Sequence, residues 1–557
     1  MKSIITSLYH TVGGRRAAMV ALLIGASAGA VHAGDMFSDS RKGWLEIAEN
    51  CKPALHETIY RPVAVVTPVR DEQSFQNWRY REAGSPDSLI YSRSFKDVES
   101  VTVDFGRHMT GFFSFNTRIL ERCQDAPVRI RFTFGELPAE INTPYDPWPG
   151  TLSRAWMQEE VMNITNIGET IEIPRRMACR YVKIELLGAS NDFDFALDDM
   201  SFRAVSSAKG EIEMPVATAS DRMRKIHDVS VETLRECMQT VFEDGPKRDR
   251  RLWSGDLYLQ SLANRYTFRN FDLTKRCLYL FAGLSTDDGE VISNIFEYPE
   301  PHPQIGSLCL SYSLLWNSTL LEYLRDTDDY ETARNLWPVA VRQVEKALAC
   351  VDSEYMFNPN LKPEGWFFFD WRDGLDVNTA MQAAIIFGIH QTAELAEMLG
   401  KSDEVRSWLP VAKKMKEASR KRLYDGKTGL FVSGGDRQVS ILSQTWMIKA
   451  GVLDKKEARK AINAALANEG TVMPGTPYAM HYLVDAMILA DMPAEARDLL
   501  ETYWGGMVDK GADTFWESYD PDDDFISAYS FHPLNSACHA WSCTPVYFIH
   551  KYPEIFI

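Results

Sequence analysis

Two acidic segments far apart in the chain hold residues that could act together as a general acid and a general base. The first, EDGPKRDRRLWSGD, runs from Glu243 to Asp256 and interleaves four carboxylates with one lysine and three arginines. The second, GADTFWESYD, runs from Gly511 to Asp520. Acid–base catalysis requires one carboxyl group to keep its proton near neutral pH and another to lose it, so the two must lie in different environments.

The Gly245-Pro246 pair excludes a continuous helix through the first segment, because both residues disfavour a helix interior. It predicts a turn from an extended segment into the next helix. Carboxylates on both sides of this turn would converge on a cavity, where the arginines neutralise them and hold their rotamers. The alternative interpretation is a salt-bridge network that only ties the loop to the rest of the fold.

The composition excludes several classes of function. The chain has 557 residues, 45% of them hydrophobic, which is enough for more than one domain. Its net charge of −17 argues against nucleic acid as a partner. The nine cysteines form no CxxC pair, and no HExxH or DxDxDG motif appears. We therefore expect no cofactor and no metal, apart from an incidental Ca²⁺.

The N-terminus resembles an export signal. Lys2, Arg15 and Arg16 precede the apolar run AAMVALLIGASAGA, and small residues stand before Gly34. This pattern predicts a signal peptide over residues 1–33 and a periplasmic or secreted protein, with an uncleaved anchor as the alternative. No later segment offers the ~20 apolar residues of a membrane helix, so we expect no membrane partner.

The period of the apolar residues changes once along the chain. From residue 34 to 205 it alternates, and segments such as VESVTVDFG, TGFFSFNTRI, VRIRFTFGEL, ETIEIP and CRYVKIELLG predict strands. In VRIRFTF, the alternation places Val128, Ile130, Phe132 and Phe134 on one face. From residue 206 to 557 the period is helical, beginning with a cap, ATAS, before DRMRKIHDVSVETLRECMQ. The fold class predicted is an N-terminal antiparallel β-sandwich followed by an all-α domain.

The helical half fits either an open solenoid or a closed α/α toroid. A solenoid should repeat every 30–45 residues or so, and no such repeat is visible. Closure is therefore favoured.

The first segment resembles the catalytic signature of the α-L-rhamnosidases of glycoside hydrolase family 78, which reads close to DCPQRDERLGWTGD. Four other segments resemble family motifs in the same order: VDFGRHMTGFFSFNT, FTFGE, CRYVKIE and GADTFWESYD. The segment SACHAWSCTPVYF takes the place of the family's closing helix. The resemblance implies a sandwich ahead of an (α/α)6 barrel and a carbohydrate substrate carrying α-L-rhamnose. It also implies inversion at the anomeric carbon, by an acid and a base about 6.5–9.5 Å apart.

The resemblance implies roles for individual residues. Glu517 corresponds to the carboxylate that activates water; a carboxylate at a helix start is the structural alternative. Sugar-binding roles are implied for Asp244, Arg248, Trp253 and Asp256, and for the residues of three further motifs: Asp370, Trp371, Trp516 and His539. For Trp516 and His539, packing inside the core is the competing interpretation.

One departure from the family concerns the proton donor. The family's glutamate is replaced by Arg250, and the segment is one residue shorter before Trp253. We expect Asp249 to act as general acid, with Glu243 or Asp244, or a lost or altered activity, as alternatives. Two other functions therefore stay open: a glucuronyl hydrolase or polysaccharide lyase of the same fold, and a glycan-binding protein without catalysis.

Overall fold

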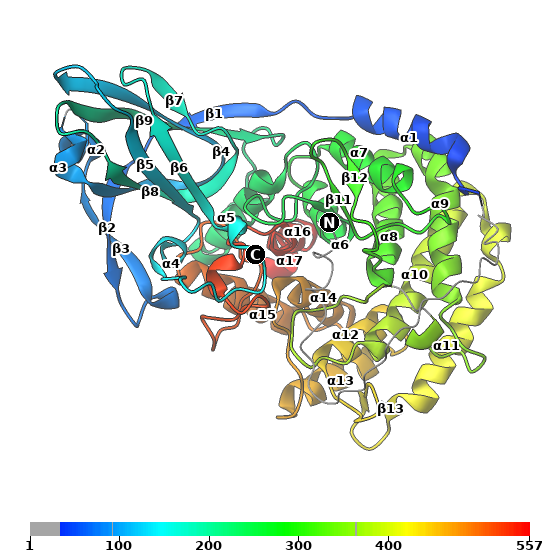
Figure 1. The fold of residues 1–557 in the computed structure, drawn as a ribbon. Coiled ribbons are helices and arrows are strands. Elements are labelled where there is room, and N and C mark those ends of the chain that lie inside the picture. Colours follow the sequence, from blue (N-terminus) through cyan, green and yellow to red (C-terminus); the bar gives the residue numbers. More distant parts are fainter. Residues whose placement is uncertain (1–33, 92, 362–364) are drawn as a thin grey trace, which may run out of the picture.

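The computed structural model describes residues 34–91, 93–361 and 365–557, which form a β-rich domain and a helical domain side by side (Figure 1). The predicted signal peptide at residues 1–33 lies outside the described residues. Within the described ranges, no helix combines the length and the apolar composition needed to span a bilayer.

The β domain is a single antiparallel sheet in which the 22-residue strand β4 is central. The order is β1-β9-β4-β8-β5-β6, with β2 and β7 also paired to β4 and β3 paired to β2. The strands are β1 (His56–Tyr60), β2 (Ala64–Arg70), β3 (Trp78–Gly84), β4 (Ser100–Glu121), β5 (Val128–Gly135), β6 (Gln158–Ile164), β7 (Thr170–Glu172), β8 (Met177–Gly188) and β9 (Asp194–Ser206).

Alternating burial confirms how the sequence builds this sheet. Val128, Ile130, Phe132 and Phe134 of β5 are at most 1% exposed and lie in the core of the domain, as predicted. The two strands expected around Gly106 are instead one strand, β4, with a register shift between Asp104 and Met109 where it pairs with β8. The strand continues through this irregularity, so the interruption in the alternation of apolar residues near Gly106 does not mark the end of a strand.

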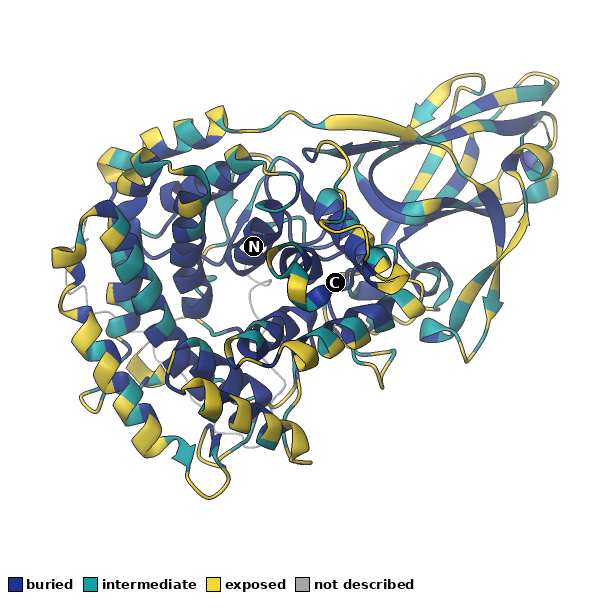
Figure 2. Ribbon diagram, turned by 180° about the vertical axis from the view of Figure 1, so that it is seen from behind, coloured by how far each residue is buried: buried dark blue, intermediate teal, exposed yellow. Residues whose placement is uncertain are grey.

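The helical domain is a ring of inner helices surrounded by outer helices (Figures 1 and 2). The inner helices are α6 (Ser254–Asn264), α8 (Leu310–Thr327), α10 (Asn378–Leu399), α12 (Ile441–Lys449), α14 (Pro477–Leu489) and α16 (Pro545–Lys551). The outer helices are α5 (Asp221–Cys237), α7 (Phe271–Gly283), α9 (Tyr330–Leu348), α11 (Trp408–Arg422), α13 (Lys455–Ala467) and α15 (Pro493–Asp509).

The ring is closed, which confirms the toroid. Successive inner helices from α6 to α14 are in contact, α16 contacts α6, and residues 540–542 contact both α14 and α6. Every residue of α6 is buried, whereas outer helices such as α9 bury one face, and Figure 2 shows this contrast between inner and outer helices. A helix that is covered on all sides needs little polar surface, in keeping with the apolar inner segments.

The segment before α16 differs from the expected closing helix. Residues 536–543 contain only a short turn, Ala540–Ser542, and the helix begins at Pro545. The backbone N–H groups of His539 and Ala540 donate to Phe515 O (2.9 Å) and Asp244 O (2.7 Å). These bonds to the two acidic segments replace the i→i−4 bonds that a helix would make.

The N-terminal helix α1 (Ser38–Asn50) packs on the helical domain, although the sequence pattern groups residues 34–205 with the β domain. Arg41 donates to the carbonyl oxygens of Gly283 (3.1 Å) and Ser285 (2.7 Å) next to α7. Trp44 donates to Asn335 Oδ1 of α9 at 3.0 Å. The chain thus crosses from one domain to the other before β1.

The close approach of β4 and β9 generates a stability prediction. Gly111 pairs with Ala204, and a Cβ at Gly111 would lie 2.0 Å from the carbonyl oxygen of Arg203. Because backbone must shift to admit a methyl group, we expect Gly111→Ala to lower the free energy of unfolding by about 1–3 kcal/mol. Thermal denaturation measures this. Gly188→Ala at the end of β8, where nothing lies within 4 Å, is the control. Equal melting temperatures for the two variants would contradict the prediction.

Candidate active site

The turn between α5 and α6 is folded around the side chain of Asp244. Its two carboxylate oxygens accept the backbone N–H groups of Asp249 and Arg251, both at 3.1 Å. Gly245 is required beside it, because a Cβ there would lie 2.5 Å from Arg248 O and 2.5 Å from Ser536 Oγ. The Gly-Pro pair therefore lets the turn pack tightly against the second acidic segment, which explains its presence among dense charges.

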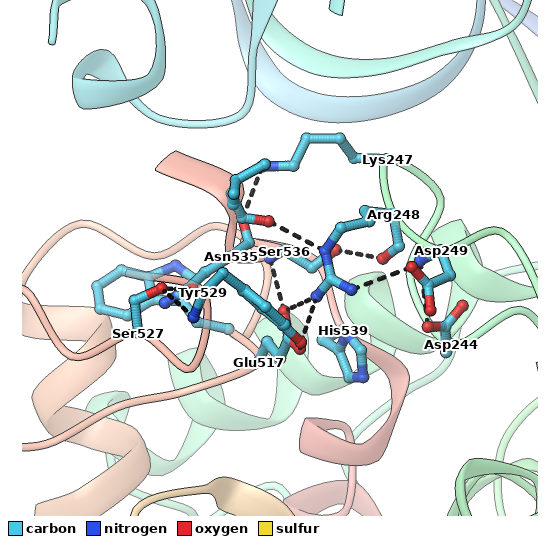
Figure 3. Close-up of polar contacts among 12 residues, drawn as sticks. Asp244, Lys247, Arg248, Asp249, Glu517, Ser527, Tyr529, Asn535, Ser536 and His539 are labelled. Atoms are coloured by element: carbon cyan, nitrogen blue, oxygen red, sulfur yellow. Dashed lines mark hydrogen bonds and ion pairs between the residues drawn. The ribbon is translucent and has the colours of Figure 1, made fainter. Parts of the chain in front are cut away.

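Arg248 joins the two acidic segments with one guanidinium group (Figure 3). Its Nη1 donates to Asp249 Oδ1 at 3.1 Å, and its Nη2 donates to Glu517 Oε2. The Arg248 side chain is 4% exposed and that of Glu517 is 2% exposed. Arg248 Nε donates to Leu534 O at 3.1 Å, so the orientation of the guanidinium group is fixed as well as its position. Arg248 thereby pairs with a carboxylate 269 positions away in the chain as well as with its neighbour Asp249.

Glu517 is held in its ionised form. Besides Arg248, it accepts the N–H of Ser536 at 2.9 Å and the hydroxyl of Tyr529 at 2.5 Å. Burial alone would raise the pKa of this carboxyl, but the guanidinium of Arg248 and the imidazole of His539 outweigh it, and the pKa falls to about 2. Glu517 does not start a helix, which removes the helix-start interpretation of this residue.

The other carboxyl groups of the site retain protons more readily. Burial and the neighbouring charge of Asp249 raise the pKa of Asp244 to about 7. Burial also raises the pKa of Asp256. For His539, burial opposes the imidazolium, but the carboxylates of Asp256 and Glu517 outweigh it and raise the pKa. One turn and one facing segment thus combine a permanently ionised carboxylate with protonatable ones, as acid–base chemistry requires.

These groups line one pocket of about 310 Å³, open to solvent. Its walls are aromatic: Trp253, Tyr312, Trp366, Phe368, Trp371, Tyr529 and Trp541. His539 Nε2 lies 3.3 Å from Asp256 Oδ1 in an ion pair, whereas two buried polar atoms at this pocket, Trp253 Nε1 and His539 Nδ1, have no hydrogen-bond partner. Since unpaired buried polar groups are costly, these atoms mark positions where a polar ligand would bind.

Eight of the ten residues predicted for the site line this pocket. They are Asp244, Arg248, Asp249, Trp253, Asp256, Trp371, Glu517 and His539. Their roles remain predictions, but the structure brings them together around one cavity.

Asp370 and Trp516 lie elsewhere, which differs from the direct sugar contact expected for them. Asp370 accepts bonds from Gly475 N–H (2.7 Å) and Thr476 Oγ1 (2.6 Å), and so ties the 365–376 loop to the start of α14. Trp516 stacks on Phe75 of the β domain, with ring centroids 4.2 Å apart. Adjacent residues of an extended segment point to opposite sides, so Glu517 faces the pocket and Trp516 faces away.

Arg250, at the position of the family's acid, is also turned away from the pocket. Its Nε donates to Pro246 O at 2.8 Å and its Nη2 to Gln158 Oε1 at 3.4 Å, toward the β domain. Asp249 and Asp244 are therefore the carboxyl groups that this turn presents to the cavity.

Several residues of the site had no signal in the sequence. Tyr529 lies in an irregular loop, and its bonds to Glu517 and Arg248 depend on the tertiary fold. Trp366, Phe368 and Trp541 stand in aromatic-rich stretches that predict core packing equally well. Among the described residues, no group of three or more His, Cys, Asp or Glu side chains is arranged to hold a metal ion.

Two family models match the chain. Residues 62–204 match the glycosyl hydrolase family 78 alpha-rhamnosidase N-terminal domain. Residues 214–552 match the bacterial alpha-L-rhamnosidase 6 hairpin glycosidase domain. No curated protein sequence matches.

Solved structures agree with the family models. A rhamnosidase from Klebsiella oxytoca with rhamnose bound is 38% identical, with a TM-score of 0.87 over 92% of this chain and 99% of that one. The family 78 rhamnosidase of Bacillus sp. GL1 is 20% identical, with a TM-score of 0.66 over 81% of this chain and 46% of that one. The latter similarity concerns the fold alone.

The shared guanidinium generates a prediction about stability. Arg248→Met leaves the charge of Glu517 buried without its partner, and we expect a loss of about 3–5 kcal/mol in the free energy of unfolding. The double variant Arg248→Met/Glu517→Gln removes both charges and should recover at least half of that loss. Urea unfolding of the three proteins measures the coupling. Arg118→Met, which breaks an exposed pair with Asp198, should cost less than about 1 kcal/mol. Additive losses in the double variant would contradict the account.

Proposed function

The chain belongs to glycoside hydrolase family 78, the α-L-rhamnosidases, and from this premise we propose that it is an exported, inverting enzyme that releases terminal α-L-rhamnose from glycans or glycosides. Both family models and the similarity to the Klebsiella rhamnosidase establish the glycoside hydrolase class. The mechanism, the catalytic residues and the cellular location form the proposal.

The observation that carries the mechanism is the pair of carboxylates on Arg248. Asp249 and Glu517 lie on separate nitrogens of one guanidinium and line the same pocket. Two carboxyl groups facing one sugar from two sides are what inversion requires, one to protonate the leaving oxygen and one to direct water.

Asp249 is the proposed general acid. It is 13% exposed, more than Arg248 or Glu517, and it contacts Asp244 through its backbone N–H. Burial and the neighbouring Asp249 raise the pKa of Asp244 to about 7, so a protonated carboxyl group stands beside Asp249 near neutral pH. In the proposed step, Asp249 transfers a carboxyl proton to the glycosidic oxygen as the bond from that oxygen to the anomeric carbon breaks, and Asp249 is left as a carboxylate.

Glu517 is the proposed base. It remains a carboxylate throughout the working range, because Arg248 and its hydrogen bonds hold its pKa at about 2. Such a weak base suffices for this reaction, because water becomes strongly acidic as it bonds to an oxocarbenium-like carbon. Glu517 orients the water, accepts one of its protons and leaves the hydroxyl group on the face opposite the departing oxygen.

The pocket lining supports a deoxy sugar as the occupant. The unpartnered Trp253 Nε1 offers a donor to ring hydroxyl groups, and the carboxylate of Asp256, which lines the same pocket, offers acceptors. Rhamnose carries a methyl group in place of a hydroxymethyl group, and the aromatic walls provide apolar surface for it.

Export and the domain limits belong to the same proposal. The charged start, apolar run and small residues before Gly34 support removal of residues 1–33 during export. The two family matches, ending at residue 204 and beginning at residue 214, support the boundary near residue 205 between the β domain and the helical domain, while α1 packs on the latter.

An assay with two substrates tests the function. We expect the purified protein to release rhamnose from an aryl α-L-rhamnoside and from rhamnose-capped oligosaccharides, and Glu517→Gln to lower kcat at least about 10³-fold on both. Asp249→Asn should lower kcat about 10²–10⁴-fold on the oligosaccharide but far less on an aryl rhamnoside whose leaving group needs no proton. Asp373→Asn, in an exposed loop, is the control.

Three outcomes would contradict the proposal. Folded protein that releases no rhamnose from either substrate excludes the rhamnosidase. An unsaturated product absorbing in the ultraviolet indicates a lyase. Sugar binding without turnover, unchanged in Asp249→Asn and Glu517→Gln, indicates a binding protein.

The raised pKa of Asp244 predicts the pH dependence. Asp244 loses its proton as the pH rises through about 7, so kcat/KM should decline above that pH. On the acid side, Glu517 stays ionised, so activity should persist to about pH 4. Asp244→Asn should remove the alkaline limb, whereas His539→Gln should retain it and move it to higher pH, because the charge of His539 lowers the pKa of Asp244. An alkaline limb that Asp244→Asn leaves unchanged would contradict the assignment.

A further inference from the structure

A buried cluster of charges joins the β domain to the catalytic turn. The ammonium group of Lys247, the residue before Arg248, lies 3.0 Å from Glu140 Oε1 and 3.2 Å from Glu136 Oε2. Both glutamates belong to the β domain: Glu136 ends the FTFGE stretch after β5, and Glu140 lies in the short helix α4 (Pro138–Asn142). The side chains of all three residues are at most 3% exposed.

The same cluster holds the backbone of residues 533–537. Lys247 Nζ donates to the carbonyl oxygens of Pro533 (3.1 Å) and Asn535 (2.6 Å). Glu136 Oε2 accepts the N–H of Ala537 at 2.6 Å. The backbone of residues 535–537, called the 535–537 strip below, is thus fixed on both sides of Ser536: Lys247 of the turn binds Asn535, and Glu136 of the β domain binds Ala537.

Ser536 passes this placement to Glu517 and Arg248 (Figure 3). Its N–H donates to Glu517 Oε2 at 2.9 Å, and its carbonyl oxygen accepts the N–H of Glu517 at 2.9 Å. Its hydroxyl donates to the carbonyl oxygen of Arg248 at 2.8 Å. Lys247 and Glu136, which fix the backbone around Ser536, therefore also help to fix the position and direction of the Glu517 carboxylate.

We infer that Glu136, Glu140 and Lys247 are positioning residues for hydrolysis: they hold the 535–537 strip so that Ser536 and Arg248 orient the Glu517 carboxylate toward the water it activates. The inference rests on the proposed function. It makes the β domain part of the catalytic apparatus, although none of the described residues of that domain lines the pocket.

Attachment of the two domains does not require such a cluster. Ion pairs buried this deeply are often no more stabilising than apolar residues of the same size. Elsewhere, Arg107 of β4 joins Glu232 of α5 in a pair whose side chains are 38% and 28% exposed. The buried cluster fixes the orientation of the groups it contacts, because Lys247 and Glu136 each have several partners.

The charges of Glu136 and Lys247 persist in the buried state. Burial disfavours the carboxylate of Glu136, but Lys247 and His108 outweigh it and lower its pKa. His108 Nε2 lies 3.0 Å from Glu136 Oε1, so His108 of β4 supports the carboxylate from behind. For Glu140, burial dominates and raises the pKa to about 7.

Kinetics of Glu136→Gln test the inference. The substitution keeps the size of the side chain and one acceptor for Ala537, but removes the charge that orders Lys247 and the strip. We expect kcat to fall about 10–100-fold, with KM within about threefold, because a displacement of about 1 Å at a reacting group has effects of this size. We also expect kcat to begin falling at a higher pH on the acid side, because a displaced Ser536 N–H and Arg248 no longer hold the pKa of Glu517 so low.

The groups that face Glu517 define the controls for that pH profile. They are Arg248, Tyr529, Ser536, His539 and Asp256, and Glu136→Gln alters none of them directly. Arg107→Met breaks an interdomain pair that touches no pocket residue, so kcat and the acid limb should match those of the unsubstituted enzyme. If Glu136→Gln folds poorly, Lys247→Met/Glu140→Gln removes the other two members of the cluster and leaves Glu136 paired with His108, and the same changes are expected.

The outcomes separate this inference from the proposed function. Unsubstituted protein without rhamnosidase activity defeats the proposed function. Active unsubstituted protein, together with folded Glu136→Gln or Lys247→Met/Glu140→Gln that keeps kcat and the acid limb, overturns the inference alone. The same loss of kcat in Arg107→Met would also overturn it, because general domain attachment would then be the cause.

Discussion

The interaction on which the site depends is the fork of Arg248 between two carboxylates from distant parts of the chain. A buried carboxylate is stable only when a charged partner and hydrogen bonds replace its lost water, and Glu517 obtains both from Arg248, Ser536 and Tyr529. The same cation fixes Asp249 on its other nitrogen. One planar group therefore sets the charge state of Glu517, the proposed base, and its position relative to the proposed acid.

The fold serves this arrangement by bringing three pieces of backbone together. The closed ring places the α5–α6 turn beside the segment that carries Glu517. The backbone of residues 536–540 forms hydrogen bonds to these two segments instead of the hydrogen bonds of a helix. The β domain contributes Glu136 and Glu140 from outside the ring. A pocket of protonatable and ionised groups thus follows from packing between segments, and each segment alone would leave its charges unpaired.

The sequence predicted those parts of the fold and site that local patterns determine. The alternation of apolar residues placed Phe132 and Phe134 in the core. Helical periodicity, together with the absence of a regular sequence repeat, predicted the closed ring. The resemblance to family 78 predicted Asp249 and Glu517 as partners, but not that one arginine would join them. The sequence did not predict features that depend on long-range contacts. α1 packs on the helical domain, Trp516 stacks on Phe75, and Tyr529 binds Glu517 from an irregular loop. No local pattern encodes a contact whose partner lies in another segment.

The central claim is that an acid and a water-directing base face the sugar from opposite sides. Proton NMR of the anomeric region during the first minutes of α-L-rhamnoside hydrolysis tests it most directly, because mutarotation is slower than turnover at high enzyme concentration. The account predicts β-L-rhamnose as the first product, followed by slow appearance of the α anomer. α-L-Rhamnose as the first product would mean retention, with the carboxyl groups only about 5–5.5 Å apart and Glu517 attacking the sugar itself, and would contradict the account.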